Sequence, residues 1–425
     1  MQASGDAIVE TMTETFRPES AEQVTEVVAW AAAEAQPLEL LGRGSKRGLG
    51  RPVQAGHGLD LSALGGITLY EPEELVLSAQ AGTPLAEIEA AIEEQNQMLA
   101  FEPPDLAPLY GGEAGAGSIG GLLACNLSGP RRIKAGAARD HFLGLAAVSG
   151  RGELFRSGGR VVKNVTGYDL CKLLAGSHGT LAAITEVTVK VLPRPEKVRS
   201  VLLLGLDDRQ AVEAMTRALA SEHEVSSAAH LPASLAARSA VSYVGSAGGA
   251  VTALRIEGPA ASVLHRTEAL RRALAGFGET EELHGHNSRT LWREVAAGAP
   301  LGGRGDSEAS DGERAVWRLS VPPRDGAAVL DKITGDGAGE GYYDWGGGLL
   351  WISVPAVEDA AQGLVRAAVA SVGGHATLFR APDAIRAAVA VFEPLADGKM
   401  LLTERIKDGF DPHRVLNPGR MYAGL

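Results

Sequence analysis

Two glycine clusters in the sequence hold the residue types that a phosphate-binding site needs. The first is Gly42-Arg43-Gly44-Ser45-Lys46, and the second spans residues 115–129. A pyrophosphate is bound by several converging backbone N–H groups, and glycine lets them approach because it has no Cβ atom. The first cluster adds a hydroxyl group and two cationic side chains. We therefore expect a phosphate-binding loop at residues 42–46, although an ordinary turn after a strand would also account for its glycines.

The second cluster contains Gly115-Ala-Gly117-Ser-Ile-Gly120, which matches the G-x-G-x-x-G pattern of dinucleotide-binding folds. In a Rossmann fold this pattern follows a buried strand and opens a crossover helix. Here it follows a proline-rich stretch with Pro103, Pro104 and Pro108. That context disfavours a nicotinamide site of the Rossmann type. Two separate glycine loops remain, and a dinucleotide such as FAD is long enough to lie between them.

The elements that must position the first loop follow from the hydrophobic pattern. Val24, Val28 and Ala31 recur at helical spacing after Ser20, so residues 20–35 are predicted to form a helix. Residues 38–41 form a short apolar run that indicates a strand ending in the glycine loop. A strand at 75–80 and a helix at 84–96 follow. This alternation predicts an α+β or α/β organisation.

Later segments indicate a second domain. Strands are expected at 143–149, 152–156 and 181–192, and Pro193 with Pro195 marks a domain boundary. Beyond it the pattern alternates again, with strands at 201–206 and 251–257 and helices at 209–221 and 262–275. We predict helices packed on an antiparallel sheet, with an exposed loop at 302–312. The proposed domains are 1–195, 196–405 and a C-terminal tail, 406–425.

Composition narrows the class of protein. A chain of 425 residues has room for about two or three domains. The net charge of −12 disfavours nucleic acid as a partner. Cys125 and Cys171 are far apart, without the spacing of a disulfide framework or a metal site, and we expect both to be small buried hydrophobic residues. No stretch has the length and apolar character of a membrane span or a signal peptide.

The ordered motifs resemble the FAD-binding domain of the vanillyl-alcohol oxidase superfamily, also called the PCMH type. The resemblance is carried by Gly42 to Ser45, by Ser118 to Gly121 with Asn126 to Gly129, and by Arg139-Asp140-His-Phe-Leu-Gly144. It continues through Gly176-Ser-His-Gly-Thr-Leu181, Phe410-Asp-Pro412 and Leu416-Asn-Pro-Gly-Arg420. The fold that it implies is α+β, with a two-subdomain FAD-binding domain and an α/β cap domain built on an antiparallel sheet.

Within that superfamily the chain is most similar to the FAD-binding E subunits of bacterial glycolate oxidase complexes. Three further stretches carry this similarity: residues 161–169, Tyr343-Asp-Trp-Gly-Gly347 with Leu350-Trp351, and Gly374-His-Ala-Thr-Leu-Phe-Arg380. It implies FAD bound without a covalent link, because Arg43 or Gly44 stands where a linking histidine would be. The residues that it implies for FAD binding are Gly42, Arg43, Gly44, Ser45, Lys46, Ser118, Gly120, Gly121, Asn126, Ser128, Gly129 and Ile184.

The resemblance also implies oxidation of a small 2-hydroxy acid such as glycolate, which needs a cation for the carboxylate and a base for the hydroxyl proton. His375 and Arg380 are our candidates for these catalytic roles. Their offset of five positions predicts that they point to opposite faces of one regular strand. The aromatic residues around Tyr343 and Trp351 fit either a cap over the flavin or core packing.

The catalytic partner subunits of this family carry His-rich signatures that are not found in this sequence. The resemblance therefore favours the interpretation that glycolate is oxidised on a homologous flavin subunit. An iron–sulfur subunit is a further partner that it implies. A self-sufficient 2-hydroxy-acid dehydrogenase of the D-lactate type and a noncatalytic assembly subunit remain alternatives. We expect a cytoplasmic protein, at most peripheral to the inner membrane through its partners.

Overall fold

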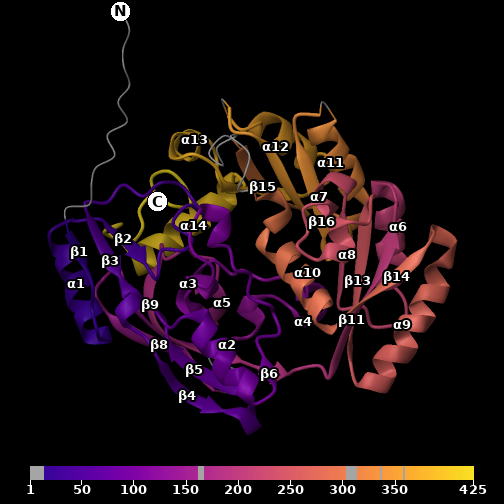
Figure 1. Cartoon of the computed structure of the whole chain (residues 1–425). Coiled ribbons are helices and arrows are strands. Elements are labelled where there is room, and N and C mark those ends of the chain that lie inside the picture. Colours follow the sequence, from indigo (N-terminus) through magenta and orange to yellow (C-terminus); the bar gives the residue numbers. More distant parts are fainter. Residues whose placement is uncertain (1–13, 161–166, 303–313, 336, 358) are drawn as a thin grey trace, which may run out of the picture.

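The computed structural model describes residues 14–160, 167–302, 314–335, 337–357 and 359–425. Figure 1 shows two parts side by side, with the C-terminal segment returning to the first of them. We call them the N-terminal part (residues 14–193), the cap (197–380) and the tail (383–425). The predicted domain boundaries at 195 and 405 stay predictions; the first falls between two strands and the second inside a helix of the tail.

The N-terminal part begins with a small parallel sheet. Its strands are β1 (Glu14–Phe16), β3 (His57–Asp60) and β2 (Leu38–Leu41), in that spatial order. Helix α1 (Ala21–Ala33) packs on this sheet with its buried residues Val24, Val28 and Ala31. The helix begins where predicted, because the Ser20 side chain accepts a hydrogen bond from the Gln23 N–H at 3.3 Å.

A five-stranded antiparallel sheet forms the rest of this part. Its order is β4 (Ile67–Glu71), β5 (Val76–Gln80), β9 (Ala182–Lys190), β7 (Phe142–Ser149) and β8 (Leu154–Gly158). The accompanying helices are α2 (Leu85–Glu94), α3 (Ile119–Ala124), α4 (Arg132–Ala135) and α5 (Leu170–Leu174). A two-stranded ladder of β6 (Gln97–Met98) and β10 (Leu192–Pro193) leads to the cap.

The cap is built on an eight-stranded antiparallel sheet. The strand order is β14 (Thr280–His284), β11 (Lys197–Leu204), β13 (Val251–Gly258), β12 (Ser227–Leu231), β16 (Glu340–Asp344), β17 (Leu349–Pro355), β15 (Arg314–Ser320) and β18 (His375–Arg380). Helices α6 (Asp208–Leu219), α9 (Ala260–Leu274), α11 (Gly326–Thr334) and α12 (Gln362–Ala370) share a core with one face. Helix α10 (Gly285–Ala297) packs on the other face, toward the N-terminal part. The α+β prediction with an antiparallel cap sheet is therefore confirmed.

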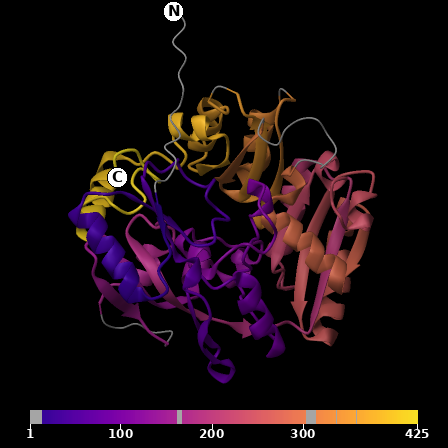
Figure 2. The same ribbon diagram turned by 60° about the vertical axis from the view of Figure 1, so that its left-hand side comes forward.

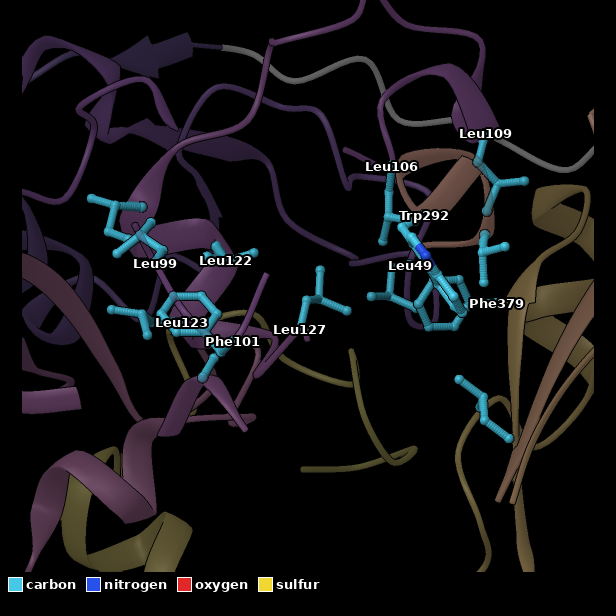
Figure 3. Packing of buried hydrophobic residues seen from close by; sticks show 14 of the residues in the cluster. Leu49, Leu99, Phe101, Leu106, Leu109, Leu122, Leu123, Leu127, Trp292 and Phe379 are labelled. Carbon is cyan, nitrogen blue, oxygen red and sulfur yellow. The ribbon is translucent and has the colours of Figure 1, made fainter. Parts of the chain in front are cut away.

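One hydrophobic core joins the two parts. Leu106 and Leu109 of the N-terminal part belong to the same buried cluster as Trp292 and Phe379 of the cap. Figure 3 shows these side chains converging where the two parts meet. Since burial of apolar surface is the main favourable term in folding, this shared core holds the cap against the N-terminal part.

A buried network of charges crosses the same boundary. Glu102 receives two hydrogen bonds from the Arg255 guanidinium, at 2.6 and 2.7 Å. Glu257 receives two from Arg131, at 2.8 and 3.0 Å. Burial alone would raise the pKa values of both carboxyls, but the two arginines lower them, in Glu257 to about 2. Because each bidentate pair joins the N-terminal part to the cap, the network fixes their relative orientation.

The tail runs back over the N-terminal part. It contains α13 (Asp383–Ala388) and α14 (Asp397–Phe410), and Figure 2 shows its last residues in yellow beside the indigo N-terminal segments. Lys407 is its anchor: the buried ammonium donates to Asp411 at 2.7 Å, to the Thr180 carbonyl at 2.7 Å and to the Leu416 carbonyl at 3.0 Å. The backbone at Leu416 also bridges to Leu38 of β2. The tail is thus tied to the strand that leads into the first glycine loop.

The predicted helices and strands agree with the observed ones to within a few residues. The loop predicted at 302–312 lies, except for Gly302, outside the described residues. Most of the extended prediction 181–192 is found as β9. Among the helices of the described ranges, none is both long and apolar enough to cross a bilayer.

Arg255→Met should destabilise the protein by about 3–5 kcal/mol, because it leaves the buried Glu102 carboxylate with Arg131 alone, 3.9 Å away. Urea unfolding measures this. The control is Arg238→Met, which breaks a bidentate pair with Glu340 inside the cap whose side chains are 30% and 23% exposed. That pair should contribute only about 0–1 kcal/mol. Equal losses of unfolding free energy in the two variants would contradict the claim that the buried network contributes more to stability than an exposed ion pair.

Candidate functional site

The first glycine loop follows directly on β2, as the sequence predicted. Gly44 has a φ of 73°, a backbone conformation that favours glycine. A Cβ atom on Gly42 would lie 2.6 Å from the Ser118 Oγ of the second loop. The absence of a side chain at Gly42 therefore lets the two glycine loops touch, which the sequence could not show.

The second loop opens α3. The Ser118 side chain caps this helix by accepting a hydrogen bond from the Gly121 N–H at 3.4 Å. Gly120 lies against Ala81 so closely that a Cβ atom would come within 2.6 Å of the alanine Cβ. This pattern of a capping serine and close-packed glycine holds the start of α3 beside the first loop.

Both loops line one hollow of about 100 Å³. Ala182 and Ile184 of β9 and the tail residues Asn417 and Arg420 also line it. Of the residues predicted to bind FAD, those that line it are Gly42, Arg43, Gly44, Ser45, Lys46, Ser118, Gly120, Gly121 and Ile184. The structure thus brings both predicted loops to one cavity.

The charge of the hollow suits an anion. The Lys46 ammonium lies 2.9 Å from the Ser45 hydroxyl, and no carboxylate of the described chain lies within ion-pair distance of it. Burial lowers the pKa of Lys46, an effect only partly offset by Cys125 and Asp105. Arg420 donates to the carbonyls of Lys46 and Arg47, at 3.2 and 3.4 Å, and so reinforces the loop from the tail. A pyrophosphate would supply the negative charge that this lysine lacks.

Three residues predicted for the cofactor stand outside the lining of the hollow. The Asn126 Oδ1 accepts from the Arg139 N–H at 3.1 Å, and the Ser128 hydroxyl from the Ala138 N–H at 2.8 Å. The Gly129 carbonyl accepts from the Trp345 indole at 3.2 Å. In this structure they brace the segment after α3, and a direct role in binding FAD stays a prediction.

Residues that the sequence analysis did not propose for the cofactor also line the hollow. Asn417 accepts from the Leu40 N–H and donates to the His178 carbonyl, both at 2.8 Å. The His178 Nδ1 is buried without a hydrogen-bond partner in the described chain. Burial and then Arg420 lower the pKa of His178 to about 3, so this imidazole is neutral. The tail motif that contains Asn417 and Arg420 was the available signal, but only the fold shows that it returns to this site.

Cys125 differs from the prediction that it is a small buried hydrophobic residue. It caps the C-terminal end of α3, is only half-buried and faces the hollow, whereas Cys171 is fully buried as expected. Burial raises the pKa of the Cys125 thiol, against a smaller opposing effect of Lys46. A protonated thiol is a poor nucleophile.

The predicted catalytic pair lies on β18, away from the lining of the hollow. The register with β15 shifts between Val316 and Trp317, so Arg380 pairs with Val316 and His375 with Ser320. Val316 and Ser320 share a face of β15, and directly paired residues share a face of a sheet. His375 and Arg380 therefore point to the same side, and the expectation of opposite faces was wrong because a bulge at this place changes the alternation.

The surroundings of the two side chains differ. Arg380 donates to the Leu109 carbonyl of the N-terminal part at 3.2 Å. His375 is exposed, and partial desolvation followed by the charge of Arg318 lowers its pKa. The catalytic role of His375 and Arg380 stays a prediction.

The aromatic residues near β16 and β17 mostly form core. Tyr342, Tyr343 and Trp351 are almost fully buried, and each tyrosine hydroxyl has a hydrogen-bond acceptor within 2.7 Å. Next to them, Asp344 is also buried, and it accepts a hydrogen bond from the Trp345 N–H at 2.7 Å. Desolvation raises the pKa of Asp344 to about 8. Asp344, at the end of β16 in the cap sheet, is thus a buried carboxylic acid that is largely neutral at pH 7.

Comparison with known proteins agrees with this geometry. The family "FAD binding domain" matches residues 13–158. The glycolate oxidase subunit GlcE of Escherichia coli K12 is 36% identical over 400 residues, which cover 94% of this chain and 97% of that protein. The chain belongs to the GlcE family of glycolate oxidase subunits. It is accordingly a member of the FAD-linked oxidoreductases, and its FAD-binding domain indicates FAD as the cofactor.

Other relatives match the GlcE-like chain over a shorter stretch. Glycolate oxidase subunit GlcD of Bacillus subtilis is 30% identical over 188 residues, 44% of this chain and 38% of that protein. Among solved structures, p-cresol methylhydroxylase has a TM-score of 0.71 at 16% identity, covering 96% of this chain and 88% of that one. This likeness confirms the vanillyl-alcohol oxidase fold with its FAD-binding and cap domains.

Lys46→Met should weaken FAD binding by about tenfold or more, because a charged hydrogen-bond donor to the pyrophosphate is lost. Titrating the cofactor-free chain with FAD and following flavin fluorescence measures the affinity. Lys332→Met removes an exposed lysine of α11 in the cap and should leave the affinity unchanged. An unchanged affinity for FAD in the Lys46 variant would contradict a role of this lysine in binding the pyrophosphate.

Asp344→Asn should raise the unfolding temperature at pH 8, by roughly 2 °C or more, and have little effect at pH 4. The folded-state pKa of about 8 exceeds the ordinary 3.8. The native protein therefore retains a proton that the unfolded chain releases, and this group's contribution to stability falls as the pH rises through that window. Thermal unfolding at both pH values tests the sign, with exposed Asp331→Asn as the control. A shift equal at both pH values would contradict a neutral Asp344.

Proposed function

We propose that this GlcE-family chain holds FAD noncovalently between residues 42–46 and 118–129 and serves as a flavin subunit of a glycolate-oxidising complex. The observation that carries the proposal is the convergence of two glycine loops on a hollow with a lysine that has no carboxylate partner in the described chain. The glycine backbone of the first loop and the start of α3 would bind the pyrophosphate. When bound, FAD supplies the hydride acceptor for oxidation of a CH–OH group.

Noncovalent binding is supported by the residues near the hollow. The first loop offers Arg43 and Gly44 rather than a histidine. His178 is neutral and Cys125 is a protonated thiol, and both line the cavity. Acid precipitation separates the alternatives, since noncovalent FAD passes into the supernatant. A yellow precipitate would instead indicate a covalently bound flavin, with His178 and Cys125 as the candidate points of attachment.

The proposed partners are a homologous catalytic flavin subunit and an iron–sulfur subunit that receives the electrons. The similarity to GlcD of Bacillus subtilis supports a homologous partner, because 44% of this chain has a counterpart in that glycolate oxidase subunit. The same proposal places the complex in the cytoplasm or at the inner membrane surface, where this chain would be attached through its partners.

A second candidate function is a self-sufficient 2-hydroxy-acid dehydrogenase. It is favoured by a D-lactate dehydrogenase of Anaerostipes hadrus that is 34% identical over 163 residues, 38% of this chain and 32% of that protein. In that case His375 and Arg380, which share the inner face of the cap sheet, are the candidates for the base and the carboxylate ligand.

Anaerobic addition of glycolate to the yellow chain should leave its visible spectrum unchanged until the partner subunits are added, and then bleach it. Stopped-flow absorbance measures both steps, and D-lactate serves as a second substrate. Bleaching of the chain alone would establish the self-sufficient dehydrogenase. A flavin that stays oxidised even in the reconstituted complex would favour a noncatalytic assembly subunit.

A further inference from the structure

Two arginines converge on Trp345 at the boundary between the cap and the N-terminal part. The Arg132 guanidinium carbon lies 4.6 Å from the centre of the indole, and that of Arg318 lies 4.9 Å from it. Arg132 comes from α4, just after the segment whose Gly129 carbonyl accepts from the Trp345 indole N–H. Arg318 comes from β15 of the cap sheet. The cluster is therefore assembled from both parts of the molecule.

Neither guanidinium is neutralised by the described chain. Arg132 and Arg318 have cation–π contacts but no hydrogen bond to protein and no carboxylate within 4.0 Å. Their neighbours Arg131 and Arg255, in contrast, are both paired bidentately with glutamates. Fixed positive charges in a partly buried place are costly unless an anion accompanies them.

The two cations also act on each other. Burial and then the charge of Arg132 lower the pKa of Arg318 to about 10, still high enough to leave it charged at neutral pH. Asp344 opposes this effect on Arg318, but its own pKa of about 8 leaves it largely protonated. On Arg132, the opposing effect of Asp140 is smaller than the repulsion from Arg139. An anion placed at the two guanidinium groups would relieve their mutual repulsion.

The rim of the cluster is polar on the cap side. Thr377 pairs directly with Arg318 across the β15–β18 ladder, and His375 pairs with Ser320 two positions along the same face. Arg318 further lies 5.6 Å from the Trp351 ring centre and 5.8 Å from that of Phe379. Arg318 thus contacts three aromatic rings, whose apolar surroundings offer its charge no counter-ion.

We propose that Arg132 and Arg318 bind the carboxylate group of a small 2-hydroxy acid or of its 2-oxo product beside the Trp345 ring. The guanidinium fork matches the two oxygens of a carboxylate. His375, on the same face as Arg318, is placed at the rim where the hydroxyl end of such an acid would lie. The identity of the acid rests on the proposed function, but the anion site rests on the two unpaired arginines alone.

The site has a consequence for the whole molecule. One of its arginines belongs to the N-terminal part and the other to the cap, so the bound acid bridges them. Binding should therefore be sensitive to substitution on either side of the boundary, which an adventitious surface site in one part would not be.

Isothermal titration calorimetry of the FAD-loaded full chain with oxalate tests the proposal. Oxalate has the two-carbon skeleton of glycolate but no C–H bond to oxidise, so binding is measured without turnover. Arg318→Met and, separately, Arg132→Met should each weaken binding by about tenfold or more. Arg324→Met, which removes a cap arginine with an 88% exposed side chain, should leave it unchanged.

Several outcomes would overturn the proposal. These are oxalate affinities equal in all variants, loss in only one of the two arginine variants, and inorganic phosphate binding more tightly than oxalate at the same residues. Because each substitution removes a charge from a partly buried place and breaks no hydrogen bond, neither variant should unfold at a markedly lower temperature than the wild type, which verifies that both fold. Flavin absorbance is recorded in parallel. A chain that contains FAD but does not bind oxalate would contradict this inference alone. A chain that binds oxalate but cannot take up FAD would contradict the proposed function alone.

Discussion

The buried pairs Glu102–Arg255 and Arg131–Glu257 are the constraint on which the arrangement of the molecule depends. Two carboxylates and two guanidinium groups are removed from water at the boundary between the cap and the N-terminal part, and only complete pairing offsets that cost. Bidentate geometry leaves little freedom in angle. The cap sheet therefore meets the N-terminal part in one orientation, and the apolar cluster around Trp292 fills the space beside the charges.

That orientation decides which side chains meet at the boundary. Arg131 belongs to the network, and Arg132, its neighbour in sequence, is thereby directed to Trp345 of the cap. On the other side, the tail returns to β2 through the buried Lys407, which brings Arg420 against the first glycine loop. The hollow for FAD and the arginine cluster are thus both products of contacts between segments far apart in the chain.

Local patterns in the sequence predicted the elements well. The Ser20 cap, the alternation of strands and helices and the two glycine loops depend on neighbouring residues, and all were found where expected. The family resemblance supplied the fold class and the cofactor, which composition and periodicity alone could not. The glycines at 42 and 120 were predicted from their pattern, but the contact of Gly42 with Ser118 that explains the first of them is visible only in the fold.

Features set by nonlocal geometry escaped prediction. A single register shift in β18 reverses the side to which Arg380 points, and nothing in the alternation of His375 to Arg380 signals it. Asn126 and Ser128 belong to a motif typical of the family, yet their side chains are occupied by the backbone of Arg139 and Ala138. Arg132 and Arg318 lie at the same indole ring only because the cap packs against the N-terminal part. No local sequence pattern predicts that contact.

The most direct test of the central claim is the amount of FAD in the full-length chain purified without its partners, from the ratio of flavin absorbance to protein. The account predicts an equimolar, acid-extractable flavin, because residues of both glycine loops of this one chain line the hollow. A colourless chain that takes up no FAD when the cofactor is added in excess would contradict it.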